Sequence, residues 1–263
     1  MASRALTYSS YLHLDELLAC QVPVSEGPEH DELLFIVVHQ VYELWFKALL
    51  HEFAHLQENL EAGDAAAAGA AAKRILTILK TVVAQIDVLE TMTPLGFGSF
   101  RGRLESASGF QSAQFRQLEA VLGRRDPSML EPYAEGSPER TAIAEAMQRR
   151  SVFDSLLRYL AAAGHALPAG ALDRDVTQPI TPDPAVQEAL VAIYRADPAA
   201  GGVCERLVDI DEGIQEWRYR HVKMVERTIG ARPGTGGSAG AEYLRSTLFR
   251  PAFPDLWEIR SRL

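Results

Sequence analysis

Apolar residues recur along most of the chain at the three- and four-residue spacing of a helix that buries one face. In the segment from about 31 to 60 they stand at 38, 42, 45, 49, 53, 56 and 60. The same spacing returns further along the chain at 75, 79, 82, 86 and 89. It appears again from about 203 to 229. Gly63 and Gly230 follow the first and last of these segments as helix ends. The pattern predicts three long helices.

Shorter helices are expected near 112–122, 138–149, 151–163 and 185–195, the second of them opened by Ser137 and Pro138. No stretch of alternating apolar and polar residues bounded by hairpin turns is present, and no internal repeat. The predicted fold class is therefore all-α with no substantial sheet, in one domain over residues 1–263.

Two stretches lack a clear pattern. Residues 64–73 are rich in alanine and predict either a weak helix start or a mobile connector. Residues 93–111 lose all periodicity and contain four glycines, which predicts a long loop. Long loops inside compact domains are often functional, so this one is a candidate for a binding segment.

Composition narrows the class of protein. The chain has 26 Lys and Arg against 35 Asp and Glu, a net charge of −9, which argues against a nucleic-acid or anionic-membrane surface. The longest strictly aliphatic or aromatic run, at 33–38, has six residues, far short of the roughly 20 that span a bilayer. No signal peptide is visible, and two cysteines are too few for a disulfide scaffold. These features predict a soluble cytoplasmic protein without a nucleic-acid or membrane partner.

The residues His51-Glu52-Phe53-Ala54-His55 form an H-E-x-x-H motif, which on a helix can place two imidazoles on one zinc ion. A zinc hydrolase is therefore one alternative. The extended motif with a third histidine is absent, however, and Lys47 and Glu58 lie on the same side of the helix. A solvated helix face is the interpretation that the neighbours favour.

A glycine-rich stretch at 234–240 contains Thr235 and follows a helix. A dinucleotide-binding loop must follow a strand, so that interpretation is rejected. Two histidines, in contrast, stand on apolar helix faces. His221 continues the stripe of the last long helix, and His39 follows an aliphatic run. Each is either a hydrogen-bonded core residue or a functional group, with metal or haem-iron ligation as the alternative for His221.

Several long strings of the sequence match one known family. The longest runs from His30 to Lys47, HDELLFIVVHQVYELWFK. The others are YSSYL at 8–12, Phe100-Arg101, SGFQS at 108–112 with FR at 115–116, WRYRH at 217–221 and GTGGS at 234–238. In this order the strings resemble the tryptophan 2,3-dioxygenase family, and the resemblance covers nearly the whole chain.

The resemblance implies a helical homotetramer with a b-type haem between long helices. It also implies that both atoms of O₂ are inserted across the indole C2–C3 bond of L-tryptophan, giving N-formylkynurenine in tryptophan catabolism by the kynurenine pathway. His221 would be the axial iron ligand, and His39 would hold the indole N–H on the opposite side. The remaining substrate-binding residues would be Arg101 for the carboxylate, Thr235 for the ammonium and carboxylate, Phe35, Phe97, Ser108 and Gly109 around the substrate, and Tyr8, Tyr11 and Leu12. The last three belong to the segment 1–24, which would reach in from a neighbouring subunit.

Two alternatives stay open within this resemblance. Some relatives act on methylated or hydroxylated tryptophans, and some of those insert one oxygen atom instead of two. A helical haem-binding or sensor protein could also keep His221 without turnover. In addition, residues 196–202 are shorter than the corresponding family segment and lack its large side chains, which leaves local packing there open.

Overall fold

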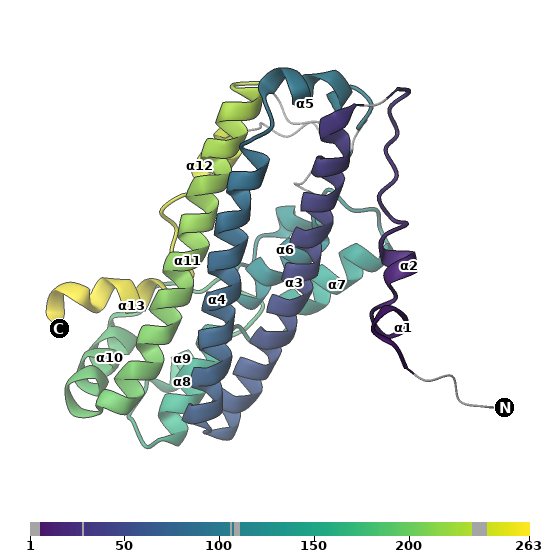
Figure 1. The fold of residues 1–263 in the computed structure, drawn as a ribbon. Helices are drawn as coiled ribbons and strands as arrows, with labels where there is room; N and C mark the ends of the chain where they lie inside the picture. The colour runs from purple at the N-terminus through teal and green to yellow at the C-terminus, as the bar shows by residue number, and fades with distance from the viewer. Residues whose placement is uncertain (1–5, 28, 106, 108–110, 233–240) are drawn as a thin grey trace.

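Three long helices form the body of the molecule. The computed structural model describes residues 6–27, 29–105, 107, 111–232 and 241–263. In it, α3 (His30–Ala62), α4 (Ala65–Leu89) and α11 (Pro198–Ile229) lie side by side, and α4 packs against both of the others (Figure 1). The described residues contain no strand, so the predicted all-α fold class is confirmed.

The apolar stripes predicted for these helices face one another in the core. Positions 75, 79, 82, 86 and 89 of α4 are all buried. In α3 the buried aromatic residues are Tyr42, Phe46 and Phe53, while Trp45, which the predicted stripe includes, is only partly buried at the edge of the core. Gly63 ends α3 with φ 76°, a left-handed conformation that glycine adopts without steric cost. The alanine-rich stretch after it is helical from Ala65, because the Asp64 side chain accepts a hydrogen bond from the Ala67 N–H at 2.9 Å.

Shorter helices pack around this body. They are α1 (Tyr8–Leu12), α2 (Leu14–Leu17), α5 (Pro94–Arg101), α6 (Ala113–Val121), η2 (Pro127–Leu130), α7 (Pro138–Met147), α8 (Val152–Ala162), α9 (Ala169–Leu172), α10 (Pro184–Ala196), α12 (Ala241–Ser246), α13 (Pro254–Glu258) and η3 (Ile259–Arg262). Helices α6 and α8 contact α3, and α10 and α13 contact α11. Helix α5 covers the upper end of the body, where it contacts both α3 and α11 (Figure 1).

The predicted long loop at 93–111 is wrong in its first half, which forms α5. The Thr93 side chain accepts a hydrogen bond from the Gly96 N–H at 3.0 Å, and Pro94 stands at the first helical position, where its missing N–H costs nothing. This helix has no recognisable apolar periodicity, because two of its eight residues are glycines. Its start signals, Thr93 and Pro94, are nevertheless present in the sequence. Arg101 is consequently the last residue of a helix, not part of a structureless stretch.

The last long helix begins five residues earlier than predicted, at Pro198. The Asp197 side chain accepts hydrogen bonds from the Ala199 and Ala200 N–H groups at 3.0 and 3.1 Å. The small side chains of 199–202 let this first turn approach α10, where a Cβ on Gly201 would lie 3.5 Å from the Tyr194 ring. The segment stripped of large side chains is thus a close helix contact.

The N-terminal part of the chain and the outer face of α3 expose many apolar side chains. Residues 6–25, here called the N-terminal arm, extend away from the body on the α3 side (Figure 1). On α3, Leu33, Val37 and Leu44 are exposed. Helix α3 is also long and apolar enough to cross a membrane by length and composition alone, a test that core helices of other proteins pass as well.

Candidate active site

His39 lies on α3 with its ring orientation fixed by its own helix. Its Nδ1 is 2.7 Å from the carbonyl oxygen of Phe35, one turn earlier. Because a carbonyl only accepts, Nδ1 carries the proton in the neutral ring, which leaves Nε2 as an acceptor. Burial lowers the pKa of His39 and so favours this neutral form.

An aromatic cluster surrounds the Phe35 side of His39. The Phe35 ring centroid lies 4.0 Å from that of His39, 5.8 Å from that of Phe97 and 5.6 Å from that of Phe100. Phe97 and Phe100 come from α5, whose last residue is Arg101. The helix that was not predicted therefore brings Phe97 and Arg101 to the same end of the molecule as Phe35 and His39.

His221 lies on α11 with Trp217 packed against it. The two rings are stacked, with centroids 5.0 Å apart and planes 14° from parallel, as the spacing of one turn predicts. Trp217 in turn contacts Phe115 of α6, at 4.7 Å between centroids. Burial, with a smaller contribution from His39, lowers the pKa of His221 to about 4. Its ring makes no hydrogen bond to any residue that the structure describes, so a neutral imidazole is available to a ligand.

One cavity joins the two histidines. It encloses about 100 Å³ and has a mostly apolar wall. Helix α3 contributes His39, Tyr42 and Phe46 to that wall, α11 contributes Trp217 and His221, and α4, α6 and α12 complete it. The Trp217 Nε1 is buried there without a hydrogen-bond partner among the described residues. Phe35, Phe97 and Arg101 are outside the cavity wall, and His39 connects them to it through its contact with Phe35.

A buried cluster of arginines adjoins the cavity around Glu119. The carboxylate of Glu119 is paired with Arg116 at 2.6 Å, with Arg124 at 2.8 Å and with Arg218 at 3.4 Å. Arg116 and Arg218 also line the cavity, and burial lowers the pKa of Arg218. This wall is the part of the site suited to carboxylate groups of a ligand, because guanidinium groups bind carboxylates with matched geometry.

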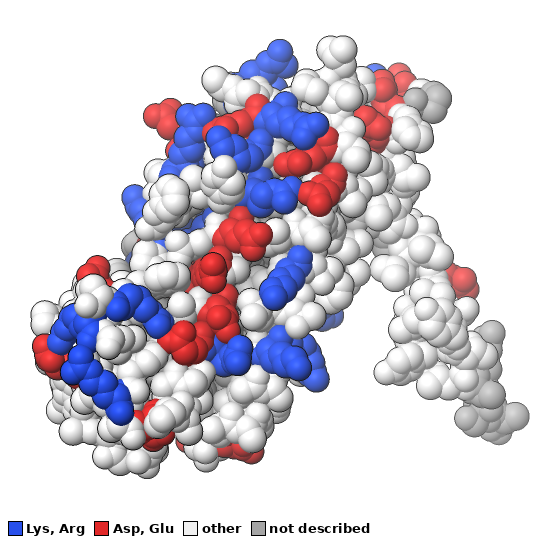
Figure 2. Space-filling view, turned by 60° about the vertical axis from the view of Figure 1, so that its left-hand side comes forward, with Lys and Arg blue, Asp and Glu red and all other residues white. Residues whose placement is uncertain are grey.

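Arg220 and Lys223, the other cations near His221 in the sequence, form surface ion pairs and do not line the cavity. Figure 2 shows blue and red side chains interleaved over the upper part of the molecule. Arg220 is paired with Asp87 and Glu90, and Lys223 is paired with Glu226 at 3.0 Å. These pairs lie across the α4 and α11 surface or along α11. Of the three cations flanking His221, Arg218 alone lines the cavity.

The remaining predicted site residues fall into two groups. Thr235, Ser108 and Gly109 lie outside the described residues. Tyr8, Tyr11 and Leu12 form part of α1 on the N-terminal arm, with exposed fractions of 76%, 68% and 39%. The structure of one chain therefore does not bring these three residues to its own His39.

The H-E-x-x-H motif does not form a metal site. His51 and His55 are exposed, whereas Glu52 is buried and pairs with Arg74 of α4 at 3.0 Å. Within the described ranges, no three His, Cys, Asp or Glu side chains are grouped as metal ligands. The motif is a solvated helix edge next to one ion pair.

Comparison with known proteins identifies the family. The family model of tryptophan 2,3-dioxygenase matches residues 1–136 and 185–263. The tryptophan 2,3-dioxygenase of Anaeromyxobacter sp. (strain K) is 65% identical over 261 residues, 99% of this chain and 97% of the relative. Those of Herpetosiphon aurantiacus and Caulobacter vibrioides are 58% and 44% identical, each over at least 98% of both chains. The chain belongs to the tryptophan 2,3-dioxygenase family.

Members of this family are oxidoreductases and are generally haem-dependent. Sequence reasoning missed the cavity wall formed by Tyr42, Phe46 and Glu119 and the contribution of α12. Phe115 and Arg116 belong to one of the strings that resemble the family, but the sequence assigns them no role. Nothing in the periodicity marks Glu119, because a glutamate on a helix is normally a solvated residue.

Proposed function

We propose that this chain catalyses the haem-dependent insertion of O₂ into L-tryptophan to give N-formylkynurenine. The observation that carries the proposal is the pairing of His39 and His221 across one cavity in a member of this family. Both atoms of O₂ enter the product, so no external electron donor is consumed in a turnover. Bound haem b would supply the iron at which O₂ is activated.

The residues around the cavity fit haem. His221 offers a neutral imidazole without a competing hydrogen bond to a described residue, which is the form that ligates iron. The stacked Trp217 ring fixes the orientation of that imidazole. Arg116 and Arg218, held by Glu119, would face the two haem carboxylates. The apolar wall excludes water from the reacting groups.

His39 would orient the indole ring. Its Nδ1–H donates to the Phe35 carbonyl, so its Nε2 is the atom that would accept the indole N–H. In this role His39 holds a proton in place and does not remove it. Phe35 and Phe97 would wall the indole, with Ser108 and Gly109 next to the substrate.

Arg101 and Thr235 would bind the amino-acid end of tryptophan. Arg101 ends α5 beside the aromatic cluster, where a planar guanidinium can grip a carboxylate through two parallel hydrogen bonds. Holding both ends of the substrate restricts the ring to one orientation, which lowers the entropic part of the barrier.

The assembly we propose is a homotetramer in which the N-terminal segment 1–24 serves a neighbouring subunit. Tyr8, Tyr11 and Leu12 are exposed on an arm that extends from its own body (Figure 1). Exposed Leu33, Val37 and Leu44 on α3 would be covered by another copy of the chain. Two free cysteines, one of them exposed, support a reducing cytoplasmic location for this assembly.

The test is product identification with ¹⁸O₂. The purified protein is reduced without air, mixed with tryptophan and exposed to ¹⁸O₂, and the product is analysed by mass spectrometry. N-formylkynurenine with two labelled atoms is expected. A single labelled atom, or product from methylated or hydroxylated tryptophan but none from tryptophan, would replace this proposal with the substituted-tryptophan alternative. A colourless, zinc-loaded protein would overturn haem chemistry altogether.

A further inference from the structure

Glu32 is a charged side chain buried in the first turn of α3, with 1% of its surface exposed. An acid at the third helical position commonly accepts a hydrogen bond from the backbone N–H of the residue that caps its own helix. Here that N–H, of Glu29, donates instead to the Gly27 carbonyl at 3.0 Å. Because burial of a charge costs free energy unless it is hydrogen-bonded, the Glu32 carboxylate must have other partners.

The partners of Glu32 are two consecutive amides of the N-terminal arm. The Val24 N–H donates to Oε1 at 2.7 Å, and the Ser25 N–H donates to Oε2 at 3.2 Å. Hydrogen bonds from Ser25 and Val24 lower the pKa of Glu32 although burial opposes them, so the carboxylate stays ionised at neutral pH. Two adjacent amides on two oxygens of one carboxylate fix the direction in which the chain enters α3.

Gln40, two turns further along α3, fixes the arm at a second point. Its Nε2 donates to the Cys20 carbonyl at 3.0 Å, and its Oε1 accepts from Gln21 Nε2 at 2.5 Å. Among the described residues, the arm (6–25) forms hydrogen bonds to the rest of the chain through the side chains of Glu32 and Gln40. Residues 20–25 are therefore held along α3, and the part of the arm before them is directed by this attachment.

Resting on the proposed function, we propose that Glu32 is a positioning residue for the neighbouring subunit's substrate pocket. By fixing the arm at Val24 and Ser25, it sets where Tyr8, Tyr11 and Leu12 arrive. Because Tyr8, Tyr11 and Leu12 would contact the bound substrate, loosening the attachment should weaken substrate binding in the pocket that they complete, which raises KM. Phe35 and His39 of a subunit's own pocket lie on the same stretch of α3 as Glu32 and Gln40. This stretch therefore connects that pocket to the arm that serves the neighbouring subunit.

The first experiment compares Glu32→Gln with the matched control Glu29→Gln. The glutamine in place of Glu32 keeps one acceptor oxygen and presents an NH₂ group to the second amide, so one hydrogen bond to the arm is lost. The control removes a negative charge from the same helix end without a contact to the arm. Glu32→Gln should raise KM for tryptophan about tenfold with little change in kcat, as expected for a lost charged hydrogen bond. Haem absorbance should be unchanged, and Glu29→Gln should behave like the wild type.

Mixed assemblies decide whether Glu32 acts on the neighbour. A chain with Glu32→Gln is co-expressed with a chain carrying His221→Ala, which has an intact arm but no haem of its own. Active pockets in Glu32→Gln subunits then receive arms from the inactive chains, and a fraction of them should recover the wild-type KM. A KM in every mixed assembly equal to that of Glu32→Gln alone would mean that Glu32 acts within its own subunit, and the proposal would fall.

Amide hydrogen exchange tests the attachment without relying on catalysis. In Glu32→Gln, the Val24 and Ser25 amides should exchange faster than in Glu29→Gln and in the wild type. Unchanged exchange would refute the attachment, whereas a wild type that does not oxidise tryptophan would refute only the proposed function. If Glu32→Gln does not fold, Val24→Pro removes the same hydrogen bond from the arm side and leaves α3 intact.

Discussion

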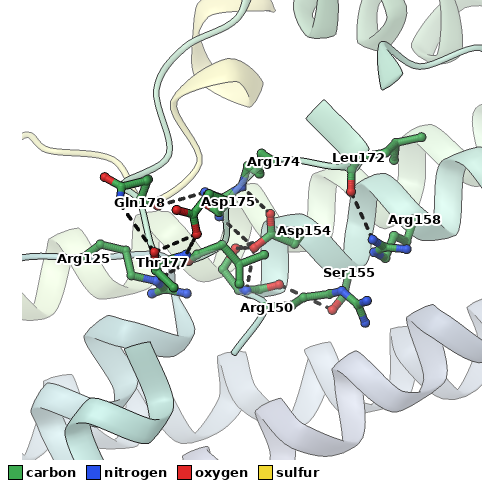
Figure 3. A network of polar contacts seen from close by, with 12 residues as sticks. Arg125, Arg150, Asp154, Ser155, Arg158, Leu172, Arg174, Asp175, Thr177 and Gln178 are labelled. Carbon is green, nitrogen blue, oxygen red and sulfur yellow. Dashed lines mark hydrogen bonds and ion pairs between the residues drawn. The ribbon is translucent and has the colours of Figure 1, made fainter. Parts of the chain in front are cut away.

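Two polar regions of this molecule differ in how completely their side chains are paired. Around α8, Arg174 makes two bonds to the Asp154 carboxylate, at 2.6 and 2.8 Å, and donates further to two backbone carbonyls (Figure 3). Arg125 directs its guanidinium at the backbone carbonyls of residues 120, 124, 149 and 176. In the cavity, by contrast, the buried Trp217 Nε1 has no hydrogen-bond partner among the described residues. The His221 ring stacks on Trp217 without a hydrogen bond to a described residue.

This difference separates a structural site from a binding site. Buried polar groups are normally paired, so the Asp154–Arg174 network, which does not line this cavity, is explained by packing. A buried polar group in the cavity wall that lacks a partner, in contrast, indicates a missing ligand. The family model agrees with this division, because its two matched parts carry His39 and His221 while Asp154 and Arg174 lie between them. The network of Figure 3 holds residues 174–178 against Asp154 of α8 and against Arg125, which follows α6.

The largest effect expected is loss of haem on removal of the unpaired imidazole. His221→Ala should abolish haem binding, seen as loss of the visible absorbance band with an unchanged helical circular dichroism spectrum. The matched control is His165→Ala, because His165 is a half-buried histidine already paired with Asp197 at 3.2 Å. Equal haem content in the two variants would remove the distinction between paired and unpaired histidines.

Breaking the paired network should cost stability and leave catalysis intact. Asp154→Ala leaves the Arg174 guanidinium without its carboxylate and removes the side chain that caps α8 together with Ser151. Removing one partner of a buried ion pair costs about 3–5 kcal/mol, which urea unfolding would measure. Arg206→Ala, which breaks the exposed pair with Asp209, is the control and should cost less than about 1 kcal/mol. A loss of kcat per folded Asp154→Ala molecule would contradict a purely structural role.

The two regions should also lose stability in different pH ranges. In haem-free protein the pKa of His221 is about 4 against an ordinary value of about 6.5, so the unfolded state binds more protons between these values. Stability is then complete above about pH 6.5 and falls by about 3 kcal/mol toward pH 4. The pKa of Asp154 is lowered by Arg174 and Ser151 in spite of burial, so its contribution is lost only below the usual range of aspartate.

Urea unfolding of haem-free protein at several pH values measures this separation. His221→Phe should flatten the slope between pH 6.5 and 4, with His39 accounting for what remains, since burial lowers its pKa as well. Asp154→Asn should leave that slope unchanged. A His221→Phe profile parallel to that of the wild type would show that the imidazole is not desolvated.

The long helices were predictable because their apolar spacing is repeated over many turns. The buried positions of α4 agree with the prediction one by one, and Gly63 and Gly230 end their helices as expected. Helix α5 was not predictable from periodicity, since eight residues with two glycines hold too few apolar positions. Its start depends on one capping threonine, a local signal that periodicity does not register.

The sequence indicated which histidines are buried, but not what surrounds them. An apolar helix face around a histidine singled out His39 and His221 and left a core role and a functional role open for each. Glu119 pairs with Arg116 of α6, with Arg124 just after α6 and with Arg218 of α11. These three arginines come together only in the folded chain. The attachment of the arm to Glu32 is of the same kind, because the sequence pattern favours an ordinary helix cap there.

Arg101→Ala tests the residue proposed for the substrate carboxylate and should have a smaller effect. Loss of a charged hydrogen-bonded pair costs about 1.5–3 kcal/mol, so KM for tryptophan should rise about 10- to 100-fold with kcat less affected. Indolepropionate carries the same carboxylate and should suffer equally, as measured from inhibition constants. Arg103→Ala is the control, because Arg103 pairs with Glu29 at 3.7 Å. Different losses for the two ligands would require another partner for the carboxylate.

The smallest effect expected is that of His39→Ala, because a hydrogen bond between neutral groups contributes only about 1 kcal/mol. We expect kcat/KM for tryptophan to fall about fivefold, with haem binding retained. The substrate 1-methyltryptophan has no indole N–H and gives the matched comparison. If the Nε2 of His39 accepts a hydrogen bond from that N–H, His39→Ala should leave the turnover of 1-methyltryptophan unchanged. An equal loss for both substrates would mean that His39 acts through its contact with Phe35.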